Sequence, residues 1–212
     1  MKSKNLCLGE VIESSLHIWQ VQTWQWDTVP AFGSLVSVQS GDREIIGVVY
    51  GIETGSSDSS RVPQTYQKTE EELRREQPQI FSLLRTKVAC LTLGYRQNGH
   101  IQYALAPQPP KIHAFVASVD SAESVEFLGK SLFLHTLFSC ESMVDNLDEL
   151  LVALVRECAD KQILDALMIG EFVKTFSLLS GNDYRRLKLF LTRVGQFLPA
   201  THERATALTG SF

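Results

Sequence analysis

The chain has 212 residues, of which 44% are hydrophobic and 21% are charged, and its formal net charge is −4. This composition is typical of a globular protein, and the length suffices for one domain or two small ones. The acidic balance argues against tight nonspecific binding of nucleic acid, which requires a positive surface. No apolar run approaches the roughly 20 residues that span a bilayer, so we expect a cytoplasmic protein without a membrane partner.

The first half of the chain predicts short β-strands, because segments rich in β-branched and aromatic residues alternate with turn formers. The predicted strands cover residues 8–12, 16–23, 35–38, 44–52, 87–94 and 101–105. Asn98-Gly99 separates the last two and predicts a hairpin, since both residues tolerate positive φ. Many short, closely spaced strands favour a barrel or a sandwich, and we place a small antiparallel β-barrel at residues 1–119.

A polar insertion interrupts this β pattern at about residues 53–84. Its first part, residues 53–61, has no strong apolar anchor, and Thr69 with Glu72 then forms the pattern of a capping box at a helix start. Pro78 limits that helix. The insertion is either a lid or contact loop of the barrel or merely a solvated excursion.

After Pro110 the apolar period changes to 3.6 residues, which predicts three helices in residues 120–198. Apolar stripes run through residues 147–158, 163–176 and 187–198, and the last segment, 199–212, is a polar tail. Asn146 and Asn182 are the expected N-caps of the first and last of these helices. The predicted fold class is therefore α+β, with helices that pack on one another, on the barrel or on a partner.

The glycine and valine pattern of the first half resembles the HAS barrel, the domain shared by HerA-type DNA translocases and ATP synthase subunits. The matching pieces are Gly9-x-Val11, Gly33-x-x-Val36-x-Val38, Gly47-x-Val49, the run 72–81 and Leu93-Gly94-Tyr95. The resemblance covers a little over half of the chain and implies a barrel that serves a larger ATP-driven machine. It also implies that Pro109-Pro110 marks the exit from the barrel toward a motor domain.

The phosphate loop that should open such a motor domain is missing. Gly129-Lys130-Ser131 ends like one, but Ser124 replaces its first glycine, and the bulky or acidic residues between them prevent amide groups from converging on phosphate. We expect a helix here that turns Val125, Leu128 and Leu132 inward.

The sequence nominates no catalytic residue, no cofactor and no metal site. The cysteines and histidines show no ligand spacing, and we expect the cysteines to be reduced and buried. These residues are Cys7, Cys90, Cys140, Cys158, His17, His100, His113, His135 and His202.

Trp24 and Trp26 are the first candidate interaction residues. On an extended strand they share one face, where they could stack on bases or clamp a peptide. The alternative is burial in the barrel core or beneath a helix, which is common for tryptophan.

Arg185, Arg186 and Arg193 are the second set, because they give the last predicted helix a basic side. Such a side either contacts phosphates or is an ordinary solvated face.

Three functional hypotheses follow. The first is a noncatalytic assembly or adaptor module related to the barrel collar of HerA-type DNA translocases, with a protein partner that is a second copy or a motor ATPase. The second is a nucleic-acid-binding accessory protein, and the third is an enzyme whose site is not visible in the sequence.

Overall fold

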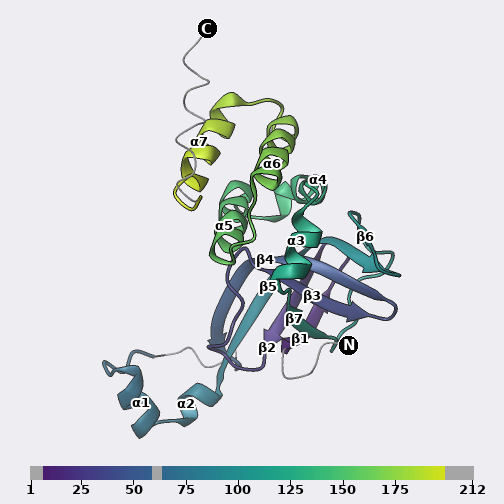
Figure 1. Ribbon diagram of the computed structural model, residues 1–212. Helices are drawn as coiled ribbons and strands as arrows, with labels where there is room; N and C mark the ends of the chain where they lie inside the picture. Colours follow the sequence, from purple (N-terminus) through teal and green to yellow (C-terminus); the bar gives the residue numbers. More distant parts are fainter. Residues whose placement is uncertain (1–6, 59–63, 199–212) are drawn as a thin grey trace.

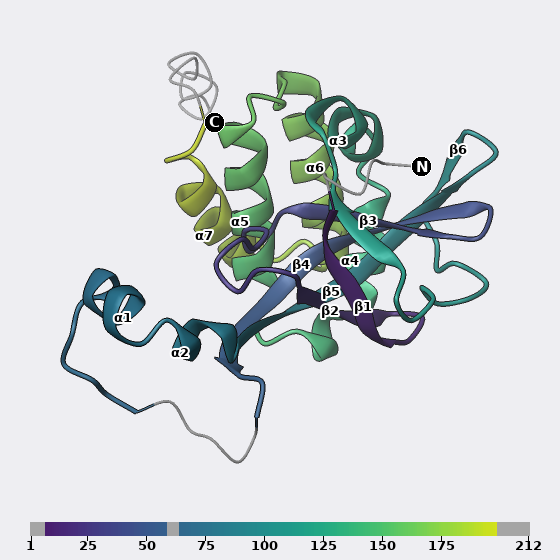
Figure 2. The same ribbon diagram turned by 90° about the horizontal axis from the view of Figure 1, so that it is seen from below.

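The computed structural model describes residues 7–58 and 64–198 (Figure 1). It consists of a β-barrel, helices stacked against one side of the barrel and a small arm that projects from the end of strands β4 and β5 (Figure 2). The predicted tail at 199–212 lies outside the described residues, as do residues 59–63 of the predicted insertion. Within the described part of the chain, no helix combines the length and apolarity needed to cross a membrane.

Six antiparallel strands close the barrel, which confirms the predicted α+β class. The ring runs β1 to β7, β3, β4, β5 and β2, and the β2–β5 pairing closes it, while β6 extends β5 as an outlying hairpin. The strands are β1 (Cys7–Ser14), β2 (Ile18–Thr23), β3 (Leu35–Ser40), β4 (Arg43–Ser56), β5 (Leu84–Gln97), β6 (His100–Gln102) and β7 (Phe115–Ser118).

Small residues allow the barrel to bend tightly enough to close. The β4–β5 pairing shifts register between Ile46 and Gly47. A Cβ atom on Gly47 would lie 2.9 Å from Cζ2 of Trp19 and 2.8 Å from the carbonyl oxygen of Leu91. Any larger residue would therefore push Trp19 out of the barrel interior, where it is only 1% exposed.

Strand β7 lies within the predicted barrel region but was not among the predicted strands, and it shows that the segment after the prolines is itself part of the barrel. Residues 115–118 lie between β1 and β3, and Val36 pairs with Ser118 in a ladder that completes the ring. The strand has only four residues, which is too short for a clear alternating pattern in the sequence. The Asn98-Gly99 hairpin is confirmed, with φ of 51° and 78° and with Gln97 paired to His100.

The arm is carried by the long β4–β5 ladder, which continues to the pair Ser56 and Leu84. It holds α1 (Glu70–Glu76) and α2 (Gln79–Ser82) and projects away from the barrel (Figures 1 and 2). The capping box of Thr69 and Glu72 is confirmed, and neither short helix has a buried residue. Helices α1 and α2 therefore contribute no residue to the buried core.

The second half of the chain is helical, as predicted. Its elements are α3 (Ser121–Leu128), α4 (Phe133–Ser139), the 3₁₀ turn η2 (Glu141–Met143), α5 (Leu147–Asp160), α6 (Ala166–Leu179) and α7 (Tyr184–Val194).

Two local predictions in this region need correction. Asn146 caps α5 as expected, but the N-cap of α7 is Asp183. Asn182 has a φ of 58°, and its backbone N–H donates a hydrogen bond to the carbonyl oxygen of Ser177. Asn182 thus serves the end of α6 and not the start of α7. The inward side expected around α3 is correct for Leu128, which is 6% exposed, but wrong for Val125 and Leu132, which are 41% and 48% exposed, and Phe127 is fully buried in their place.

The fold has two apolar cores, one inside the barrel and one between the barrel and the helices. Strand residues such as Leu35, Ile46 and Leu91 pack in the same cluster as Phe127 and Leu150 from the helices. Helices α6 and α7 stack on α4 and α5, on the side away from the barrel (Figure 1). The helical region therefore packs on the barrel through α3–α5 and leaves α6 and α7 as its outermost elements.

Candidate interaction surface

Helix α6 is far more apolar than its position in the fold requires. Glu171 and Lys174 are its only charged residues. Yet Phe176 is the only residue of this 14-residue helix that is fully buried. A helix that is apolar on most sides normally lies inside a core, so α6 has the composition of a covered helix in an exposed place.

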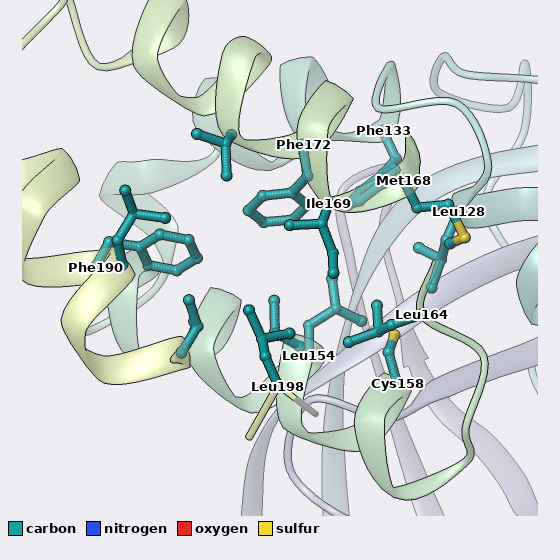
Figure 3. Close-up of a pocket in the computed structure, with 14 residues that line it drawn as sticks. Leu128, Phe133, Leu154, Cys158, Leu164, Met168, Ile169, Phe172, Phe190 and Leu198 are labelled. Carbon is teal, nitrogen blue, oxygen red and sulfur yellow. The ribbon is translucent and has the colours of Figure 1, made fainter. Parts of the chain in front are cut away.

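The inner side of α6 faces α5 and α7 across a small cavity of about 50 Å³ (Figure 3). Its walls are apolar throughout, including Leu154 and Cys158 from α5, Met168 and Phe172 from α6, and Phe190 from α7. Sites for small molecules commonly measure about 300–1,000 Å³ and contain a few convergent polar groups. The cavity is thus suited to apolar packing and not to acid, base or nucleophilic chemistry.

Stacked aromatic rings hold α6 and α7 together beside this cavity. The ring of Phe190 lies 4.5 Å from that of Phe176 and 5.7 Å from that of Phe172, with interplanar angles of 15° and 12°. Phe138 of α4 meets Phe176 edge-on at 5.7 Å. These offset and edge contacts are the favoured aromatic geometries, so α6 and α7 form a defined pair with α4.

Arg186, one of the predicted phosphate-contacting residues, instead closes this aromatic cluster. Its guanidinium donates hydrogen bonds to both carboxylate oxygens of Asp148, at 2.7–3.1 Å, and to Oε1 of Glu141 at 2.7 Å. Its Cζ also lies 5.4 Å from the ring centre of Phe138 and 5.8 Å from that of Phe176. The hydrogen bond to Asp148 raises the pKa of the guanidinium, and the side chain is committed to binding α7 onto α5 and η2.

The other two predicted arginines differ from each other. Arg193 pairs with Glu149 of α5, whereas Arg185 is exposed on the outer side of α7. The structure therefore does not gather the three arginines into one basic patch, because α5 presents acids to two of them. Their role toward nucleic acid stays a prediction, which now depends mainly on Arg185.

Trp24 and Trp26 do not share the face of a strand, because β2 ends at Thr23 and the chain bends through both residues. Trp24 is 43% exposed, meets Phe115 edge-on at 5.3 Å and donates from Nε1 to Glu10. Phe115 also lines an open concavity of about 500 Å³ on the outside of the barrel, beside the carboxylate of Glu44. The carboxylate of Glu44 is paired with Arg96, whose Nη1 lies 3.0 Å from Oε2.

Trp26 faces the arm instead. Its ring stacks on Phe81 at 5.8 Å, and the guanidinium of Arg74 lies 4.7 Å above the Phe81 ring. Arg74 also pairs with Asp27 at 3.3 Å, beside Trp26 in the chain. Trp26 thus anchors the arm to the barrel, and a platform formed by both tryptophans is absent from the described residues.

Three of the four cysteines are buried apolar residues, whereas Cys7 is half-buried, so the expectation that all of them are buried is wrong for Cys7. Cys90, Cys140 and Cys158 are buried, and burial raises the pKa of the Cys158 thiol to about 12 and that of Cys90 as well. Such thiols stay protonated at neutral pH and are poor nucleophiles. Across residues 7–58 and 64–198, no group of three His, Cys, Asp or Glu side chains is placed to hold a metal ion.

The feature that sequence reasoning missed is an apolar surface on the outer sides of α6 and α7. We call it the outer helical surface. It comprises Leu167, Leu178, Tyr184 and Leu189, which are 80%, 65%, 74% and 59% exposed. The signal was present, since apolar residues lie on all sides of α6, but the sequence does not show which of them a neighbouring helix covers.

No family model and no curated protein matches this chain.

Proposed function

We propose that this chain is a noncatalytic assembly or adaptor module that binds another protein through the outer helical surface. The observation that carries the proposal is the exposure of large apolar side chains on α6 and α7, led by Leu167 at 80% and Tyr184 at 74%. Single exposed leucines are ordinary, but several on two adjacent helices favour a binding face. A partner that covers these side chains would remove their apolar surface from water, which lowers the free energy of the complex.

The barrel adds support for the more specific form of this proposal, a relation to the collar of HerA-type motors. Its six antiparallel strands agree with the fold that the HAS-barrel resemblance implies. A fold carries an activity less securely than a site does, so the motor ATPase as partner rests on analogy. Helices α6 and α7 are the outermost elements and are therefore well placed to reach a partner while α3–α5 stay packed on the barrel.

Affinity recovery of the tagged, full-length protein from nuclease-treated native lysate tests the proposal. We expect a protein to be retained at a stoichiometric level by the wild-type chain. A double variant, Tyr184→Glu with Leu189→Asp, should lose it, because both side chains are more than half exposed and their replacement leaves the core intact. Circular dichroism of the variant verifies that it folds.

The matched control is Leu16→Asp with Leu132→Asp, which places similar charges on leucines that are 40% and 48% exposed outside α6 and α7. The control should keep the partner. Equal retention by the α7 double variant would contradict the outer helical surface as the binding face. Recovery of nucleic acid alone, sensitive to Arg185→Glu, would replace the proposal with the nucleic-acid hypothesis.

A further inference from the structure

One exposed stripe of α6 has a spacing that is the same in both directions along the helix. Its exposed residues Leu167, Glu171, Lys174 and Leu178 are spaced by four, three and four positions. In a helix of 3.6 residues per turn, this spacing places all four on one face. We call these residues the α6 stripe.

The stripe is also the side of α6 that faces solvent. Leu167 and Leu178 are 80% and 65% exposed, and the side chains of Glu171 and Lys174 are 58% and 78% exposed. Within the helix, Nζ of Lys174 lies 3.9 Å from Oε1 of Glu171, so the two charges form a loose, exposed ion pair. The opposite side of the helix carries Phe176, which is fully buried. The four side chains therefore need no movement of the fold to reach a partner.

We propose that the α6 stripe binds the same stripe of a second copy, with the two α6 helices antiparallel across a two-fold axis. The two-fold axis is perpendicular to the helix and passes between Phe172 and Val173. It places Glu171 opposite Lys174 of the second copy. It also places Leu167 opposite Leu178 of the second copy. Each copy then contributes the same pairs in reverse, as a closed two-fold interface requires. The charges are complementary in this orientation, whereas a parallel arrangement in register would place like charges together.

Gly170 is a second feature that fits this arrangement. It lies inside α6, where glycine is about 1 kcal/mol less favourable than alanine, and a Cβ atom there would meet nothing within 4 Å. Packing within the chain therefore gives no reason for the glycine. On an exposed position beside the α6 stripe, the missing side chain leaves room for the second copy to approach closely.

The size of the stripe sets the expected strength of the dimer. Helix α6 has 14 residues and is therefore about 21 Å long. A single pair of such helices buries less than the roughly 1,200 Å² of a standard stable interface. The structure thus points to a weak dimer whose population rises with concentration, which suits a module that assembles at high local concentration.

The test is sedimentation velocity of the full chain over roughly 5–500 µM, with charge variants of the α6 stripe. Wild type should sediment faster as its concentration increases. Lys174→Glu alone and Glu171→Lys alone should each reduce self-association at least about tenfold, because each homodimer then places like charges opposite each other. An equimolar mixture of the two variants should restore dimers, since every pair in the mixed dimer is again opposite in charge.

This rescue separates the inference from a loss of folding, because mixing two misfolded variants restores nothing. The combined variant Glu171→Lys with Lys174→Glu should also dimerise like wild type, and Leu167→Asp should be monomeric. A monomeric wild type over the whole range, or single variants that associate as strongly as wild type, would overturn the inference.

The inference rests on the proposed function, because it assigns an occupant to part of the outer helical surface. The two can fail separately. If the chain is monomeric but still recovers a partner through Tyr184 and Leu189, only the second copy is wrong. If neither the dimer nor the partner is found, the proposed function fails as well.

Discussion

Gly33 is the position at which the loop before β3 meets helix α5, so its replacement by alanine tests how closely the helices sit on the barrel. Its φ is +88°, and a Cβ atom would lie 2.6 Å from the carbonyl carbon of Ala153 and 2.7 Å from its Cβ. The left-handed conformation costs a residue with a Cβ about 1–2 kcal/mol, and forced overpacking adds about 1–3 kcal/mol. We expect Gly33→Ala to lower the free energy of unfolding by about 2–5 kcal/mol.

Gly41→Ala is the matched control, because Gly41 has a φ of +69° but open space where its Cβ would be. This variant should lower the free energy of unfolding only by the cost of the left-handed conformation, about 1–2 kcal/mol. Urea unfolding followed by circular dichroism and tryptophan fluorescence measures both losses. Equal losses for the two variants would refute the close contact between the Gly33 loop and α5.

Three further predictions concern the helical region. Phe176→Ala should lower the free energy of unfolding by about 3–5 kcal/mol, because the ring is fully buried. Amide hydrogen exchange should become faster in α6 and α7 while the barrel stays protected. A uniform increase over the whole chain would contradict the layered packing. Arg186→Ala should lower the free energy of unfolding by about 1–3 kcal/mol, because it leaves the half-buried Asp148 unpaired. Arg193→Ala removes an exposed ion pair and should lower it by less than about 1 kcal/mol. Urea midpoints that do not differ between the two variants would contradict this prediction. Burial raises the pKa of the Cys158 thiol from its ordinary value of 9.0 to about 12, so this thiol keeps its proton in the folded state. Its contribution should make the free energy of unfolding fall as pH rises above about 9, by up to about 1.4 kcal/mol per unit. Cys158→Ala should reduce the slope by this amount and leave the part that the buried Cys90 contributes; an unchanged slope would contradict the reasoning.

The sequence was most informative where a local rule controls the structure. Asn98-Gly99 forms its hairpin because few other pairs accept positive φ, and Thr69 with Glu72 forms its capping box because both partners lie within one turn. The apolar period of α5 likewise predicted its buried side. Each of these features depends on residues that are neighbours in the chain.

The candidate site was much harder to predict, because it depends on which charges meet in space. Arg186 and Arg193 look like a basic face in the sequence, but acids of α5 that lie 38 and 44 positions away pair with them. Trp24 and Trp26 look like one platform, but a bend after β2 directs one to Phe115 and the other to the arm. A linear pattern carries no information about such distant partners.

By itself, the sequence determined the strand-rich first half, the helical second half, the N-caps Thr69 and Asn146 and the palindromic spacing of the α6 stripe, because these features follow from local backbone preferences and helical periodicity. Only the tertiary structure decided that the short β7 completes the barrel and that the helices share a second apolar core with one side of it. It also decided that α6, apolar on most sides, keeps one of them in solvent. The physical reason is that burial is a property of packing among distant segments, so an apolar residue such as Leu167 has the same sequence signal whether a neighbour covers it or leaves it exposed.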